Sequence, residues 1–271
     1  MSQPRNLIIN ADDLGLSPEV DAGILDCVRA GAVTAVSLMV NPPYEADLAP
    51  FVAAGISLCL HWNLTLGSPV APAAGVPSLV DNDGRFVPSV DALLARLDPR
   101  DAERELRAQL DCFRRIAGRE PAQLNFHKHL HAGDERLLEI AVALARETGA
   151  PLRAINPAMR DHCRACGVRT TDHFVGDVVP APYWTEARLR EVLATIPPGE
   201  TELMCHPGRN VRPIAGLIYL AERDTERETF TSPDAKALLA EFRLCGFNIA
   251  ARHSVADCQS SRDGVAGYEQ R

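Results

Sequence analysis

Two adjacent carboxylates stand at the end of an apolar run near the start of the chain. The run Leu7–Ile9 leads to Asp12 and Asp13, and Gly15 follows them. Consecutive residues of an extended strand point to opposite faces, so both acids can serve one site only where the strand ends and the backbone turns. Gly15 permits such a turn. Two neighbouring acids in different surroundings can then divide the work, one binding a cation and the other moving a proton.

Three further segments carry histidines that could join these acids. His61 lies within the apolar stretch 58–64, the segment 127–131 holds His127, His129 and His131, and His206 precedes a Pro-Gly turn. On a straight strand, the spacing of the three histidines in 127–131 puts their imidazoles on one face but separates the outer two by roughly 13 Å. One ion cannot take all three, so the others would contact substrate or support the ligands.

Each of these features also has a purely structural explanation. Asp12 or Asp13 can cap a loop, His61 can be a hydrogen-bonded core residue, and His206 can belong to a simple turn. However, all of these residues lie at or near the carboxyl ends of predicted strands, which meet at one face of an α/β barrel. A carboxylate and two neutral imidazoles predict a site for one divalent metal ion, with Zn²⁺ favoured and Mg²⁺ as the alternative, and hydrolysis is its natural reaction.

The elements that must position these residues alternate along the chain. The clearest helix begins at Asp98 and ends before Gly118, with Leu106, Leu110 and Phe113 on one face. Strands are predicted at 7–12, 33–40, 56–64, 123–127, 152–155, 171–175, 202–205 and 248–252. Further helices are predicted at 17–30, 45–54, 137–144, 158–166, 186–195 and 233–245, and 207–231 shows no clear element. About seven or eight strands alternating with helices predict an α/β fold, a closed or partly closed (β/α) barrel with a parallel sheet. We expect a single domain over residues 1–256 and a polar tail over 257–271.

Composition narrows the classes of function. The chain has 271 residues, 46% of them hydrophobic and 24% charged, with a net charge of −8 that opposes binding to nucleic acid. No apolar run approaches the roughly 18 residues of a membrane span, and no signal peptide is evident, so a cytoplasmic location is expected. Disulfides are not expected among the eight cysteines. Cys163 and Cys166 form a single Cys-x-x-Cys, a weak indication of zinc or redox chemistry.

Six motifs together resemble the YdjC/ChbG family of carbohydrate deacetylases. They are Asn10–Ser17, Thr34–Asn41, Leu60–Thr65, Leu79–Phe86, His127–His131 and Glu202–Gly208. The resemblance implies a single distorted (β/α) barrel and metal-dependent removal of an N-acetyl group from an amino sugar. The chitooligosaccharide branch and the hopanoid-associated branch, which acts on a glycolipid sugar, are both similar, so the substrate stays open between an oligosaccharide and a glycolipid. A homodimer fits the family.

The resemblance also implies roles for individual residues. Asp13, His61 and His127 are the expected metal ligands, and Asp12 is the expected general base for the metal-bound water that attacks the amide. His206 is the candidate for protonating the leaving amine. An unidentified donor would help the metal to stabilise the oxyanion.

His129, His131 and Trp62 are candidate substrate-binding residues, and Trp62 could instead pack in the core. The family usually has Asp-Ser where this chain has Asn125 and Phe126, which removes a carboxylate and a hydroxyl that could support the ligands.

Two other functions compete with deacetylation. A metal phosphoesterase on a similar barrel would need a basic or glycine-rich loop for phosphate, and only Gly208-Arg209 resembles one. A non-catalytic sugar-binding relative is the other alternative, suggested by the change at Asn125.

Overall fold

The computed structural model describes residues 4–42 and 44–247. The strands in this part of the chain are β1 (Arg5–Leu14), β2 (Ala35–Leu38), β3 (Ser57–Trp62), β4 (Leu124–Phe126), β5 (His173–Val175), β6 (Gly199–Cys205) and β7 (Arg243–Leu244). The helices are α1 (Pro18–Arg29), α2 (Ala49–Ala53), α3 (Val90–Arg96), α4 (Pro99–Ala117), α5 (Leu130–Gly133), α6 (Glu135–Thr148), α7 (Pro157–Ala165), α8 (Glu186–Thr195), α9 (Glu222–Thr231) and α10 (Pro233–Leu239). Short 3-10 turns cover Ala73–Gly75 and His127–His129.

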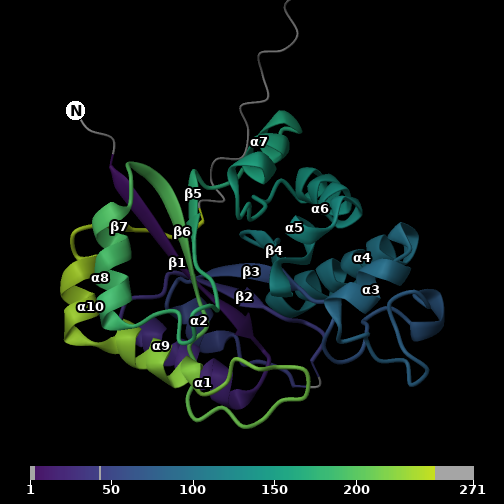
Figure 1. Cartoon of the computed structure of the whole chain (residues 1–271), viewed down its shortest axis with the longest axis horizontal. Helices are drawn as coiled ribbons and strands as arrows, with labels where there is room; N and C mark the ends of the chain where they lie inside the picture. Colours follow the sequence, from purple (N-terminus) through teal and green to yellow (C-terminus); the bar gives the residue numbers. More distant parts are fainter. Residues whose placement is uncertain (1–3, 43, 248–271) are drawn as a thin grey trace, which may run out of the picture.

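The strands form one parallel sheet in the order β4-β3-β2-β1-β6-β5. The short strand β7 pairs with the first half of β1, at Asn6 and Leu7, and β2 pairs with its second half. The sheet curls into a half-barrel (Figure 1), so the predicted distorted (β/α) barrel is confirmed, and its parallel sheet has seven strands in the described part of the chain where about seven or eight were predicted.

The central strand β1 is buried on both faces. Leu7 and Ile9 belong to the large core beneath the helices, whereas Ile8 packs inside the curled sheet with Ala35 and Cys59. A strand covered on both faces needs apolar residues at successive positions, which explains the continuous run at the start of the chain. β1 is therefore the rigid element that carries its last residues to the open end of the half-barrel.

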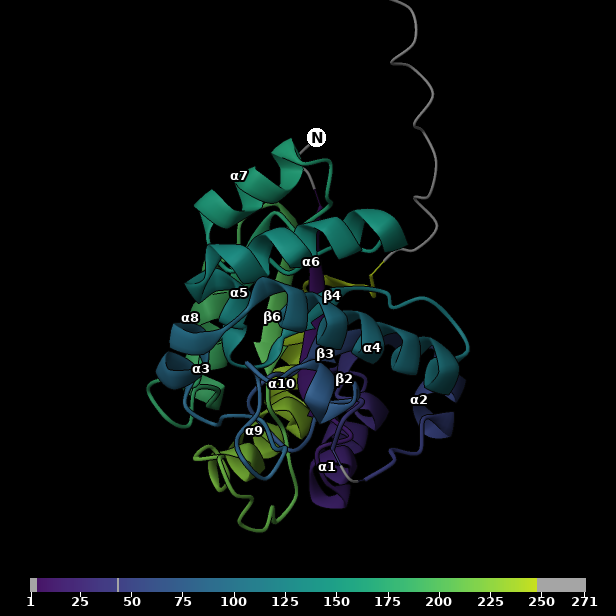
Figure 2. The same ribbon diagram turned by 90° about the vertical axis from the view of Figure 1, so that its right-hand side faces the viewer.

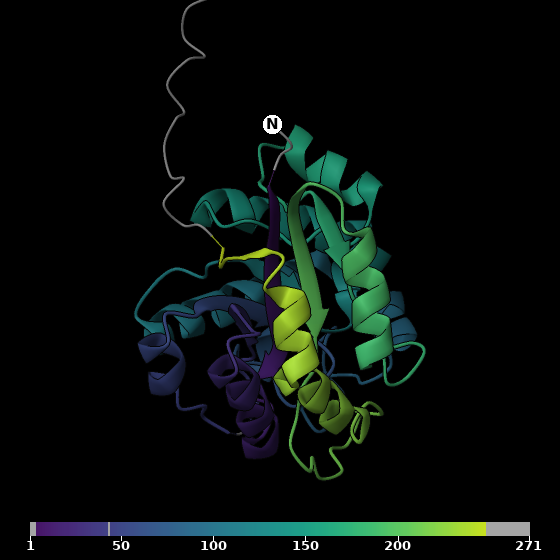
Figure 3. The same ribbon diagram turned by 90° about the vertical axis from the view of Figure 1, so that its left-hand side faces the viewer.

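Helices cover the outside of the sheet in two groups. α1, α8, α9 and α10 lie beside β1 and β6 (Figure 3), and α3, α4, α5 and α6 lie beside β3 and β4 (Figure 2). α4 has Asp98 as its N-cap and ends at Gly118, which has a φ of 63°, as its sequence predicts. The strands β1 and β6 point toward the end of the molecule where α9 lies (Figure 1).

Several element predictions were wrong. Residues 152–155 form no strand, only a bridge between Leu152 and Leu124. The last predicted helix ends at Leu239 and gives way to β7. The segment 207–231, predicted without a clear element, contains α9, whose apolar pattern is weak because it buries Arg223 and Glu226. The predicted strand at 248–252 and the tail 257–271 lie outside the described residues.

Each helix of the described part of the chain is too short or too polar to cross a membrane. The seven cysteines that the structure describes are all free thiols, and Cys163 and Cys166 lie at the end of α7, where His162 pairs with Glu139.

The contact between α1 and the segment after β6 generates a stability prediction. A Cβ atom at Gly23 would lie 2.3 to 2.7 Å from backbone atoms of Gly208. Gly23→Ala should therefore lower the free energy of unfolding by about 1–3 kcal/mol, because neither backbone can yield easily. Urea denaturation measures this change. Gly133→Ala is the matched control, since its Cβ meets nothing within 4 Å, and an equal loss in both variants would contradict the packing argument.

Candidate active site

A turn in the backbone brings both acids of β1 to one side. The register between β1 and β2 shifts between Ala11 and Leu14, which is a bulge, and Asp13 has a φ of 71° in the left-handed region. The N–H of Gly15 donates to Asp21 Oδ1 at 2.7 Å and stabilises the turn. Asp12 and Asp13 are each 1% exposed. The strained backbone is thus the reason why neighbouring residues can face the same site.

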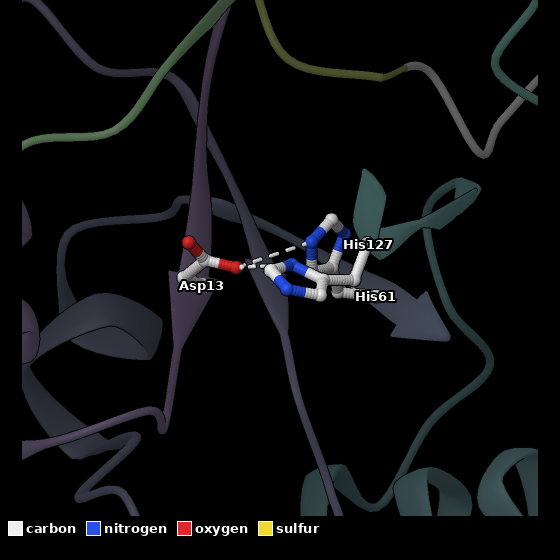
Figure 4. Close-up of side chains that lie close together, drawn as sticks. All are labelled: Asp13, His61 and His127. Carbon is white, nitrogen blue, oxygen red and sulfur yellow. Dashed lines mark hydrogen bonds and ion pairs between the residues drawn. The ribbon is translucent and has the colours of Figure 1, made fainter. Parts of the chain in front are cut away.

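Asp13 meets two imidazoles. His61 Nε2 lies 3.3 Å and His127 Nδ1 3.1 Å from the same oxygen, Asp13 Oδ1. One ligand atom from each residue falls within 4.8 Å of the others, and all three side chains are buried. Figure 4 shows both rings turned toward that single oxygen, so the three residues predicted as metal ligands lie together.

Asn125 determines the tautomer of His61. Its Nδ2 donates to Ser37 Oγ and to Gln123 Oε1, both at 2.8 Å, so its Oδ1 must face His61. His61 Nδ1 lies 2.5 Å from that oxygen and therefore carries the hydrogen. The Nε2 lone pair is left free on the side of Asp13. The amide at position 125 thus orients the ring as a carboxylate could, without adding a charge.

The donor set fits a divalent cation. Nε2 of His61 and of His127 are buried without a hydrogen-bond partner. Burial raises the pKa of Asp13, but Arg223 and His127 outweigh it and hold that pKa well below its usual value. Burial lowers the pKa of His127, so this ring is neutral. Burial also lowers the pKa of His61, but Asp12 and Asp13 raise it overall. A second proton on this ring would sit on Nε2, so a cation would compete with it for that nitrogen.

Asp12 has a different partner. Arg153 Nη1 and Nη2 donate to its two oxygens at 2.6 and 2.9 Å. Arg153 is fully buried and also pairs with Glu202 at 2.7 Å. Burial raises the pKa of Asp12, but the charge of Arg153 outweighs it, so this pKa lies far below its usual value. The fork of hydrogen bonds keeps Asp12 ionised and fixes its orientation.

His206 stands at the end of β6 with partners from the following loop and helix. Its backbone N–H donates to Glu226 Oε2, and Tyr219 Oη donates to Glu226 Oε1, both at 2.5 Å. Burial raises the pKa of Glu226 to about 7. Burial lowers the pKa of His206 to about 4, so the ring is neutral near pH 7, and its Nδ1 has no partner.

A cavity of about 390 Å³ lies at the open end of the half-barrel, and both acids and the histidines at positions 61, 127 and 206 line it. Its walls combine the acids and histidines with an apolar side. The lining residues are Asp12, Asp13, His61, Phe126, His127, Lys128, His129, Asp177, Val178, Met204, His206, Gly216, Leu217, Ile218, Tyr219 and Arg223. The cavity has the size and the convergent polar groups of a small-molecule site.

The three predicted substrate-binding residues take different positions. His129 lines the cavity, and its ring lies edge-on against Phe174. Trp62 is fully buried, and its indole donates to the carbonyl of Leu106 at 3.0 Å, so it packs in the core instead of facing the cavity. His131 stacks on Phe126, and its Nε2 donates to the carbonyl of Arg153 at 3.0 Å.

The histidine cluster does not form a strand. β4 ends at Phe126, and Lys128 and His129 have φ values of 56° and 50°. The chain therefore turns away after His127, and the three rings have different partners. One histidine meets Asp13, one lines the cavity, and one supports Arg153.

Sequence reasoning missed the arginines and their partners. Arg153 interrupts the apolar stretch 150–155, and Glu202 directly precedes the apolar run 203–205. A charge at such a position is a usable signal, because a buried charge needs an opposite charge. Arg223 and Glu226 belong to the polar stretch 222–229, where one more charge carries no comparable signal, and Tyr219 lies in the short run that precedes it.

The chain belongs to the YdjC-like protein family, whose model matches residues 6–241. A carbohydrate deacetylase of *Geobacillus stearothermophilus* is 35% identical, covering 88% of this chain and 94% of the relative. One of *Homo sapiens* is 33% identical, covering 92% of both. A chitooligosaccharide deacetylase of *Klebsiella pneumoniae* is 31% identical, covering 88% of this chain and 95% of the relative.

A solved structure has the same fold. It is that of an *Enterococcus faecalis* protein proposed to cleave cellobiose phosphate, which is 27% identical. The TM-score is 0.79, with 90% of this chain and 98% of the other covered.

The bond from His61 to Asn125 generates a prediction about metal affinity. Asn125→Ala removes the acceptor that fixes the His61 tautomer, so the affinity for Zn²⁺ should fall by about 10- to 100-fold. Competition with a chromogenic chelator measures it. Asn156→Ala, which removes the N-cap of α7 instead, should leave the affinity unchanged. Equal affinities of the Asn125→Ala protein and the wild type would refute the role assigned to this amide.

Proposed function

We propose that this protein is a metal-dependent carbohydrate N-deacetylase that removes an acetyl group from an amino sugar. The observation that carries the proposal is the pairing of a buried Asp13–His61–His127 group with a second acid, Asp12, held by Arg153 in the same cavity. The deacetylases among the relatives support the sugar substrate.

The residues divide the chemistry among them. Asp13, His61 and His127 would hold one divalent cation, with Zn²⁺ favoured over Mg²⁺ by the two imidazoles. When bound, such an ion polarises the acyl carbonyl and makes water a better nucleophile.

Asp12 would take the proton of the attacking water, since its carboxylate is ionised and oriented by Arg153. Its low pKa makes it a weak base, so its orientation contributes more than its basicity. His206 has a neutral ring, so it would accept a proton before it gives one to the leaving amine.

The substrate class can be tested directly. The protein should release acetate from N-acetylglucosamine oligomers or from glycolipids that carry an N-acetylated sugar. Release should stop with a chelator and return when Zn²⁺ is added in excess. Acetate quantified by a coupled enzymatic assay gives the answer. Binding of these sugars without acetate release would instead support a non-catalytic relative, and release of phosphate from sugar phosphates would support a phosphoesterase.

The two acids of β1 should fail differently when they are changed. Asp12→Asn should keep bound Zn²⁺ but lower kcat by about 10²- to 10⁴-fold, because it removes the general base. Asp13→Ala should lose both metal and turnover, because it removes the oxygen that both imidazoles face. Metal content per chain and kcat are the measurements.

The exposed Asp111 offers a control, and Asp111→Asn should change neither value. Retention of metal and activity by the Asp13→Ala protein would overturn the ligand assignment. Full activity of the Asp12→Asn protein would overturn the assignment of the base.

A further inference from the structure

Arg223 places a buried positive charge on the wall of the cavity. It lies in the first turn of α9 and is 1% exposed. Its Nη2 donates to Asp13 Oδ2 at 2.5 Å, and its Nε donates to the carbonyl of Tyr219 at 2.9 Å. The backbone is also held, because the carbonyl of Arg223 accepts the N–H of Gly208 at 3.0 Å. Hydrogen bonds therefore fix both the guanidinium group and the backbone of Arg223.

The two oxygens of Asp13 are thereby divided between two tasks. Oδ1 faces His61 and His127, whereas Oδ2 accepts from Arg223. A carboxylate held in this way keeps one oxygen for a cation and cannot easily rotate. Arg223 acts on the metal group through Asp13, although it is not a ligand itself.

One nitrogen of Arg223 has no partner in the structure. Nη1 is buried and has no acceptor. A buried, unpaired N–H of a charged group costs free energy, so such a group is expected to have an acceptor when the protein is at work. Since Arg223 lines the cavity, a bound molecule can supply that acceptor.

The other cation along the described cavity wall is less suitable. Lys128 is exposed, and its Nζ donates to the carbonyl of Pro88 at 3.3 Å. Arg153 is not among the lining residues, and both of its terminal nitrogens donate to Asp12, while it also pairs with Glu202. Arg223 therefore combines a fixed position, a full charge and an unused donor.

We propose that Arg223 donates a hydrogen bond from Nη1 to the oxygen of the acyl group that is cleaved, while Nη2 holds Asp13 in place. This inference rests on the proposed deacetylase function. The bond would strengthen as negative charge develops on that oxygen, because a fixed cationic donor stabilises an oxyanion more than a neutral carbonyl. Arg223 would thus be the donor that the sequence left unidentified.

Acetate, the expected product, is a probe that needs no turnover. Zn²⁺-loaded wild type should bind acetate in a calorimetric titration. Arg223→Met, studied at saturating Zn²⁺, should bind it at least about 10-fold more weakly and lose about 10²- to 10³-fold in kcat, as expected for removal of an oxyanion donor. Arg223→Met should also bind Zn²⁺ more weakly, because Asp13 loses its partner.

Two further variants make the test specific. Arg223→Lys keeps the charge, but a single ammonium group cannot serve both Asp13 and the cavity in the way of a guanidinium, so kcat should fall although Zn²⁺ stays bound. If Arg223→Met does not fold, the kcat and the acetate affinity of Arg223→Lys test the role of Arg223 instead. Arg227→Met is the matched control, since Arg227 is one turn further along α9, pairs with Asp224 and Glu228, and lies outside the cavity wall. Its acetate affinity and kcat should match the wild type.

The outcomes separate this proposal from the proposed function. If the wild type releases no acetate from any sugar, deacetylation is wrong, whereas the acetate titration still judges Arg223. Unchanged acetate affinity and kcat in a folded Arg223 variant would overturn the role of Arg223 alone. Absence of acetate binding to the Zn²⁺-loaded wild type would also count against it.

Discussion

The site depends on the neutralisation of two carboxylates that the protein buries side by side. Asp12 and Asp13 have almost no contact with solvent, and isolated charges in such surroundings would be too costly to keep. Each therefore has its own arginine, Arg153 for Asp12 and Arg223 for Asp13. The arginines approach from different elements, so the two acids keep separate surroundings although they are neighbours in the chain.

The inside of the half-barrel changes from apolar to polar along the strands. Ile8, Ala35 and Cys59 form an apolar cluster at the end of the half-barrel opposite to the cavity. One step further, Asn10 donates to Glu202 at 3.0 Å and accepts from Ser37 at 3.1 Å. This buried network supports both the partner of Asp12 and a predicted metal ligand, since Glu202 binds Arg153 and Asn125 binds His61. Residues that touch neither metal nor substrate thus determine the geometry of those that would.

The parts of the site that the sequence could reveal are those at strand ends. Each of them lies at or near the carboxyl end of a predictable strand, and parallel strands bring these ends together. The residues are Asp12, Asp13, His61, His127 and His206. α9 could not be predicted in the same way, because its inner face carries Arg223 and Glu226 and so lacks an apolar pattern. The direction of Trp62 was also beyond reach, because burial of an indole depends on the helix that packs over it. The roles of the individual residues remain predictions.

The pairing of Asp13 with Arg223 joins positions 210 residues apart. A contact of such large sequence separation forms only after most of the chain has been made and has folded. Asp13 therefore gains its arginine partner only when α9 has docked, so an ion that binds there favours the finished fold over partly folded states. During synthesis, the tightest metal binding would thus come only after α9 has been made and has docked.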